Sequence, residues 1–136
     1  MFVGMVAFKK DFNDFTKRMV REGNKAIREE AKEWFAELVY LTPKDTGFAA
    51  YNWKVSVDVK PSTELVRNPR NKGPYPSSIP EGIEGATIRS KIYMYNNVAY
   101  IKKLEDGWSK QAPKNFVKNS ARRANNRLQK RFDGIK

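Results

Sequence analysis

The sequence predicts an α+β domain, and three observations lead to that prediction. Apolar residues recur at three- and four-residue steps through about residues 8–41 and again through 113–132, the spacing of amphipathic helices. Between them, residues 48–59 and 86–95 alternate apolar and polar side chains, the spacing of half-buried strands. At 136 residues the chain can bury one modest core. We therefore expect a single domain over residues 1–136, in the order helix, strand, long loop, strand, short helix, helix.

The first predicted helix carries an apolar face and a basic one. The apolar face holds Phe8, Phe12, Phe15, Met19, Ala26 or Ile27, Trp34 and Leu38. The basic stripe holds Lys17, Arg21, Lys25, Arg28 and Lys32, and it is interleaved with Glu22, Glu29, Glu33 and Glu37. We expect several of these glutamates to pair with cations of the same helix at i,i+4 spacing. The helix is about 50 Å long, so part of it should project or lie along another subunit. Gly23-Asn24 is where it could kink.

The middle of the chain is predicted to be a small antiparallel sheet with a long connection. Residues 42–47 (TPKDTG) should form a turn, because Pro43 disfavours helical geometry before it and Asp45, Thr46 and Gly47 favour turns. A strand over 48–59 and its antiparallel partner over 86–95 follow. Residues 60–85 hold five of the seven prolines, which excludes regular structure over their length and indicates an extended surface loop or arm.

Residues 97–116 (NVAYIKKLEDGWSKQAPKNF) are predicted to join the sheet to the last helix. A short amphipathic helix should end at Asp106-Gly107, since glycine takes a left-handed conformation without steric penalty. Ala112-Pro113 should then start the last helix, because proline is favoured at a first helical position. We expect Trp108 and Pro113 to have architectural roles.

Charge is the main bulk property of the chain. Its formal net charge is +12, which predicts a polyanionic neighbour: nucleic acid or an acidic protein surface. The last helix has the highest density of cations, and the candidate contacts are Lys118, Arg122, Arg123, Arg127, Lys130 and Arg131. A membrane surface fits less well, because the apolar face of that helix is rich in alanine and lacks tryptophan. The apolar segment 1–8 precedes its lysines, unlike a secretory signal, and should pack on the core or on a neighbour.

Residue types argue against an enzyme. The chain has no cysteine and no histidine, which removes thiolate chemistry, the usual general base and the usual zinc ligands. Adjacent Glu105 and Asp106 point apart and make a poor acid/base pair. Asp45 and Thr46 have no accompanying base. We find no phosphate-binding loop and no acidic cluster spaced for a metal, so no catalytic residue, cofactor or metal is expected.

Two segments, in this order, resemble the tail-completion or head–tail joining proteins of long-tailed bacteriophages. The first, LTPKDTG followed by Trp53, is similar to the family's "TPxDTG…W" segment. The second, 99–113, is similar to its "YAxxLExGxSxQAP" segment. The candidate motif and assembly residues are Thr42, Pro43, Asp45, Thr46, Gly47 and Trp53, then Tyr100, Leu104, Glu105, Gly107, Trp108, Gln111, Ala112 and Pro113, of which Trp108 stands at a variable position of the second pattern. The chain departs from the family pattern at 48–50 and at Lys114, and its proline-rich arm is longer.

The resemblance implies a structural, non-enzymatic protein of the virion neck, assembled in the host cytoplasm. Such proteins form a ring, often of six subunits, that joins the tail to the connector of the DNA-filled head. The implied partners are copies of itself, the head connector or adaptor, and tail terminator or tail-tube proteins, with non-specific contact to packaged DNA and none to membrane. The alternative function, from composition alone, is non-specific nucleic-acid binding through the basic last helix.

Overall fold

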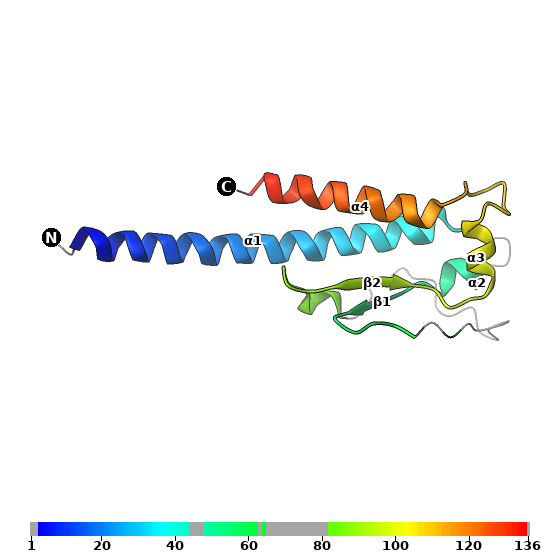
Figure 1. Cartoon of the computed structure of the whole chain (residues 1–136), viewed down its shortest axis with the longest axis horizontal. Coiled ribbons are helices and arrows are strands. Elements are labelled where there is room, and N and C mark those ends of the chain that lie inside the picture. The colour runs from blue at the N-terminus through cyan, green and yellow to red at the C-terminus, as the bar shows by residue number, and fades with distance from the viewer. Residues whose placement is uncertain (1–2, 44–47, 63, 65–81, 136) are drawn as a thin grey trace.

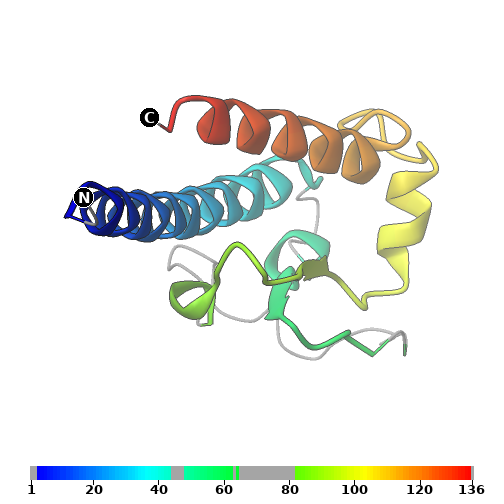
Figure 2. The same ribbon diagram turned by 60° about the vertical axis from the view of Figure 1, so that its left-hand side comes forward.

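A long helix, α1 (Val3–Leu41), is the axis of the fold and lies between a second helix and a small sheet (Figure 1). The computed structural model describes residues 3–43, 48–62, 64 and 82–135, with the backbone alone for 3–12 and Phe48. Helix α4 (Phe116–Asp133) packs on one side of α1, and strands β1 (Lys54–Val57) and β2 (Ile92–Tyr95) lie on the other (Figure 2). This arrangement confirms the predicted α+β class.

Helix α1 is continuous through Gly23, so the expected kink or break there is wrong. The glycine instead allows a close approach: a Cβ atom on it would lie 2.7 Å from Cγ2 of Ile88. The next residue secures the same contact, since Asn24 Oδ1 accepts the backbone N–H of Ile88 at 2.9 Å. The glycine therefore lets the segment before β2 dock on the helix, and tertiary contact offsets its low helix propensity.

The N-terminal part of α1 extends past the end of α4, as the helix length predicted (Figure 1). Its 39 residues give about 58 Å, whereas the 18 residues of α4 give about 27 Å. Residues 13–18 are all exposed, including half of the surface of Phe15. The apolar stripe thus becomes core only from Ala26 onward. The side chains of Phe8 and Phe12 lie outside the described residues.

The sheet is antiparallel, as predicted, but both strands are shorter than the alternation suggested. Val55 pairs with Met94 in a register that covers four residues on each strand. Residues of the expected first strand instead form a short helix, α2 (Phe48–Tyr51), and the expected second strand begins with a turn at 88–89. Ala49 and Ala50 have little strand preference and favour helix. Asp58, with φ 65°, ends β1, while its Oδ1 accepts the N–H of Lys91.

Helix α3 (Tyr100–Glu105) ends as predicted, at Gly107 with φ 90°. The last helix begins at Phe116, three residues after Pro113, so the expected start is wrong. Asn115 adopts a left-handed conformation, with φ 65°, that cannot belong to the helix. Its N–H donates to the carbonyl of Glu105 at 2.7 Å, which fixes the connection against α3. A 3-10 turn, η1 (Ile83–Gly85), closes the expected arm, and the arm's residues 65–81 lie outside the described residues.

Two clusters of buried side chains in the core meet at α3 and α4. Phe35, Leu38, Val39 and Trp53 form the first, and Ala49, Leu104, Ala112 and Phe116 form the second. Ile101 and Val117 pack against both. The short helices and the 97–116 connection are therefore attached to the end of α1 opposite its N-terminus (Figure 1).

Candidate functional site

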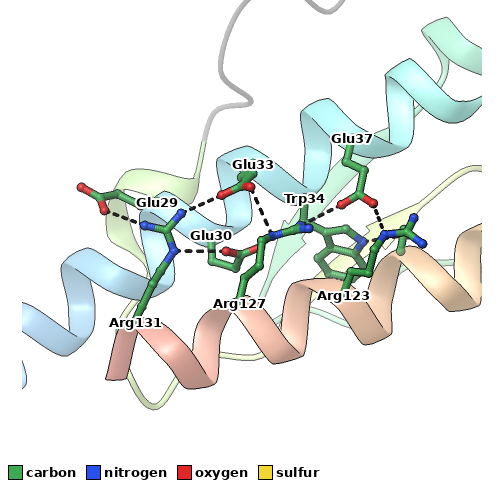
Figure 3. A network of polar contacts seen from close by, with 9 residues as sticks. Glu29, Glu30, Glu33, Trp34, Glu37, Arg123, Arg127 and Arg131 are labelled. Carbon is green, nitrogen blue, oxygen red and sulfur yellow. Dashed lines mark hydrogen bonds and ion pairs between the residues drawn. The ribbon is translucent and has the colours of Figure 1, made fainter. Parts of the chain in front are cut away.

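The contact between α1 and α4 is built on a layer of ion pairs, which we call the interhelix ion cluster (Figure 3). Its members are Glu29, Glu30, Glu33 and Glu37 of α1 and Arg123, Arg127 and Arg131 of α4. Glu29, Glu33 and Glu37 recur at four-residue steps, Glu30 precedes Glu33 by three residues, and the arginines recur at four-residue steps. Each set therefore lies on one face of its helix, and the two faces are apposed.

Glu30 lies at the centre of the interhelix ion cluster. Only 4% of its surface is exposed. Its Oε1 accepts from Arg127 Nε at 2.8 Å, and its Oε2 accepts from Arg131 Nε at 3.1 Å. Both oxygens of this buried carboxylate thus receive charge-assisted hydrogen bonds, the condition under which a buried charge is tolerated.

The remaining glutamates complete the hydrogen bonding of the arginines. Glu37 accepts from Arg127 Nη2 at 2.7 Å and from Arg123 Nε at 2.6 Å. Glu33 accepts from Arg131 Nη2 at 2.7 Å. Partial burial alone would lower the pKa of Arg127, but the hydrogen bonds to Glu37 and Glu30 outweigh it and raise that pKa above its ordinary value. The pKa of Arg131 is raised in the same way, by Glu30 and Glu33.

These pairs change two expectations drawn from the sequence. The glutamates Glu29, Glu33 and Glu37 were expected to pair along their own helix, and they pair across to α4 instead. A guanidinium presents five donors in a planar fork, and Arg131, reaching from the neighbouring helix, pairs with Glu29 and Glu33, which lie one turn apart. Three of the six candidate polyanion contacts are therefore engaged within the chain. The other three, Lys118, Arg122 and Lys130, are exposed.

The interhelix ion cluster does not carry the excess positive charge of the protein. Four carboxylates and three guanidiniums leave the cluster with one net negative charge. The residues outside the cluster therefore carry a net charge of +13, against +12 for the whole chain. Any attraction to a polyanion comes from other surfaces.

The first motif segment surrounds a buried hydrogen-bond relay. Thr42 is 1% exposed, and its Oγ1 donates to the carbonyl of Leu38 at 2.6 Å. The same hydroxyl oxygen accepts from Nε1 of Trp53 at 2.8 Å. Thr42 thus ties the end of α1 to the residue before β1, and Pro43 beside it is buried. Asp45, Thr46 and Gly47 lie outside the described residues.

The second motif segment packs on the first. Leu41, the first residue of LTPKDTG, packs against the buried cluster that holds Leu104 and Ala112, and Ile101 of the second segment packs against the cluster that holds Trp53. Ala49, between the two parts of the first segment, is buried in the same cluster as Leu104, and its carbonyl accepts from Asn96 Nδ2 at 2.6 Å. The structure therefore brings parts of the two segments together. Other motif residues face outward: Tyr100, Gln111, Pro113 and Trp108 are exposed.

Glu105 connects α3 to the start of α4. Its Oε1 accepts the N–H of Val117 at 3.2 Å, one of the donors that a helix N-terminus leaves unpaired. Asn115, in the N-cap position, makes no side-chain cap. Burial raises the pKa of Glu105, and the N–H groups of Val117 and Lys118 lower it by less. Its neighbour Asp106 is exposed, so the two adjacent carboxylates do not converge on one site.

Two hollows open along α1, and neither gathers a catalytic set. One of about 430 Å³ lies between α1 and the end of α4 and mixes cations such as Arg18 and Lys130 with Glu22 and Glu29. The other, of about 220 Å³, is mostly apolar and is lined by Trp34 and residues of β2 and α4. Nε1 of Trp34 donates to Ser120 Oγ at 3.1 Å, a structural contact.

Comparisons with known proteins add no assignment. A scan against models of protein families, a search of curated proteins and a search of solved structures each found no match. Among the described residues, no helix is long and apolar enough to cross a membrane. Within the same residues, no group of three or more acidic side chains could hold a metal ion.

Proposed function

We propose that this chain is a structural, non-enzymatic subunit of a bacteriophage neck, a tail-completion protein that assembles into a ring between the tail and the head connector. Its partners would be copies of itself, the connector or adaptor, and tail terminator or tail-tube proteins. Its place would be the mature virion, after assembly in the host cytoplasm. The proposal starts from the two motif segments and their order in the sequence.

The observation that carries the proposal is the packing of those two segments on each other. Leu41 of the first segment packs against the buried cluster that holds Leu104 and Ala112 of the second, and Ile101 of the second packs against the cluster that holds Trp53. The segments are more than 45 residues apart in the sequence, so a chance match of two unrelated stretches would not require them to meet. Residues 13–18 of α1, which are all exposed, add support, because a ring subunit needs surface that its own core does not cover.

Electron microscopy of particles made without the protein tests this proposal. We expect filled heads and complete tails that fail to join, and joining restored when the protein is supplied. Normally joined particles in its absence would refute the neck role. Mass photometry of the purified chain tests the ring separately, and a monomer that stays a monomer in the presence of tails and heads would argue against it.

The alternative, nucleic-acid binding through the basic face of α4, has less support. Arg123, Arg127 and Arg131 are engaged by carboxylates in the interhelix ion cluster. Lys118, Arg122 and Lys130 remain for phosphate contacts. Replacing these three with glutamine and measuring binding to duplex DNA at several salt concentrations would test this alternative directly.

A further inference from the structure

Trp108 is exposed and yet held in place. It belongs to the connection between α3 and α4. That connection lies at the end of the molecule opposite the N-terminus (Figure 1). Its exposed fraction is 69%, although large aromatic side chains usually bury most of their area. Sequence reasoning gave it an architectural role, but the core does not contain it.

The backbone around Trp108 forms a Schellman motif, which fixes where the side chain starts. The N–H of Trp108 donates to the carbonyl of Lys103 at 3.2 Å, and the N–H of Gly107 donates to the carbonyl of Leu104 at 3.1 Å. Gly107 supplies the left-handed residue that this motif requires and lies close against Lys114. An exposed tryptophan on a hydrogen-bonded turn loses little conformational entropy on binding.

The ammonium group of Lys103 already contacts the Trp108 ring. Nζ of Lys103 lies 4.9 Å from the ring centroid, within the range of a cation–π contact. The ring is nevertheless largely solvent-exposed, so it still offers area for another planar group. Lys110 and Lys114, in the same connection, are exposed as well. Asp106 is the exposed carboxylate among these residues, and Glu105 points to the start of α4 instead.

The charges near the ring favour a strand of phosphates as the partner. Lys103, Lys110 and Lys114 outnumber the one exposed carboxylate, Asp106. Lysine binds phosphate as a compact point charge and is depleted at protein interfaces. A tryptophan bordered by phosphate-binding lysines is the arrangement that stacks unpaired bases along a charged strand.

We propose that Trp108, with Lys103, Lys110 and Lys114, forms a binding platform for single-stranded nucleic acid. A base stacks on the exposed ring while the lysines contact the phosphates on either side of it. Duplex DNA offers no free base face, so it gains only the electrostatic part. The platform lies near the start of α4, whereas Lys130 lies near its end. The platform does not depend on the proposed neck role, so the neck role can be refuted without refuting the platform.

Fluorescence anisotropy with a labelled oligothymidylate of about ten nucleotides, a length within the usual site sizes, tests the platform. We expect Trp108→Ala to bind roughly 5- to 150-fold more weakly and Trp108→Phe to retain part of the affinity, because a ring remains for stacking. Changing Lys103, Lys110 and Lys114 to glutamine should weaken binding and flatten its salt dependence. The matched control is Arg122→Gln with Lys130→Gln on α4, which removes exposed charge elsewhere and should have a much smaller effect.

Three outcomes would overturn the proposal. The first is equal affinity of the wild type and Trp108→Ala, with circular dichroism showing that both are folded. The second is a duplex of the same length that binds as tightly and depends equally on Trp108. The third is displacement of the oligonucleotide by polyglutamate at matched charge, which would identify an acidic polypeptide as the partner.

Discussion

Nε of Arg127 lies 2.8 Å from Oε1 of Glu30, a carboxylate that is only 4% exposed. A buried charge is costly unless it is paired and hydrogen-bonded, and here the pairing comes from the last helix of the chain. Arg131 occupies the other oxygen of the same group. The cluster therefore favours the observed register of α4 on α1, because sliding α4 by one turn in either direction would leave Glu30 or Glu37 without one of its two arginines.

Replacing Glu30 with glutamine should be strongly destabilising. The change leaves Arg127 and Arg131 partly buried beside a neutral amide. The NH₂ group of that amide would face the N–H groups of an arginine, and neither side would offer an acceptor. Breaking a buried pair costs roughly 3–5 kcal/mol, and the partial exposure of the two arginines reduces the expected loss to about 2–3 kcal/mol of unfolding free energy. Urea denaturation followed by circular dichroism measures it.

The matched control for Glu30 is Glu22→Gln on the same helix. Glu22 is 3.8 Å from Arg21, and both side chains are well exposed, so its loss should cost about 0–1 kcal/mol. Equal effects of the two substitutions would show that the interhelix ion cluster does not stabilise the contact between α1 and α4.

The charged positions of the interhelix ion cluster could be seen in the sequence, but the pairing of its glutamates was predicted wrongly. The acidic positions of α1 and the arginines of α4 both recur at helical spacing, which was visible before the fold was known. Local pairing along α1 satisfied the same pattern and needed no tertiary contact. What was missing was the packing of the two helices, which depends on the apolar residues of both, such as Phe35 and Phe116.

The predicted strands illustrate a similar limit. Alternation predicted the sheet and its antiparallel order, and the pairing of Val55 with Met94 confirms both. The alternation could not predict where the strands begin and end, because it continues through residues whose backbone makes other tertiary contacts. Ala49 is buried in a helix against Leu104, and the backbone of Ile88 binds Asn24. Tertiary contacts override local pattern at these positions.

Removal of the Thr42 hydroxyl should destabilise the motif region. Thr42→Val keeps the shape but leaves Nε1 of Trp53 as a buried donor without a partner, a loss of about 1–3 kcal/mol. Trp53→Phe removes the donor, so the double variant should lose less than the sum of the single changes. A double-mutant cycle by thermal or urea denaturation measures this coupling, and strictly additive effects would contradict the relay.

Gly107 should not tolerate a side chain. Its φ of 90° is unfavourable for any L-residue, and a Cβ would lie 3.2 Å from Cβ of Lys114. We expect Gly107→Ala to lower the unfolding free energy by about 1–2 kcal/mol. Gly82→Ala, with φ 95° and open space, measures the backbone strain alone, and Gly85→Ala, also in open space, should be neutral or stabilising. A smaller loss of unfolding free energy for Gly107→Ala than for Gly82→Ala and Gly85→Ala would contradict this account.

Glu105 should give the protein a characteristic pH dependence. Burial raises the pKa of this carboxyl above its ordinary value of 4.5 in the folded state, whereas the unfolded chain keeps the ordinary value. Between these two values the folded protein holds a proton that the unfolded protein has released, so this contribution to stability is present below about pH 4.5 and is lost as the pH rises through the folded pKa. Glu105→Gln still offers an oxygen to the N–H of Val117 but cannot titrate. The stability of the wild type relative to this variant should therefore decline from about pH 4.5 upward, as measured by urea denaturation across that range. A relative stability that rises with pH would show instead that the N–H groups of Val117 and Lys118 outweigh burial and hold the carboxylate in its charged form.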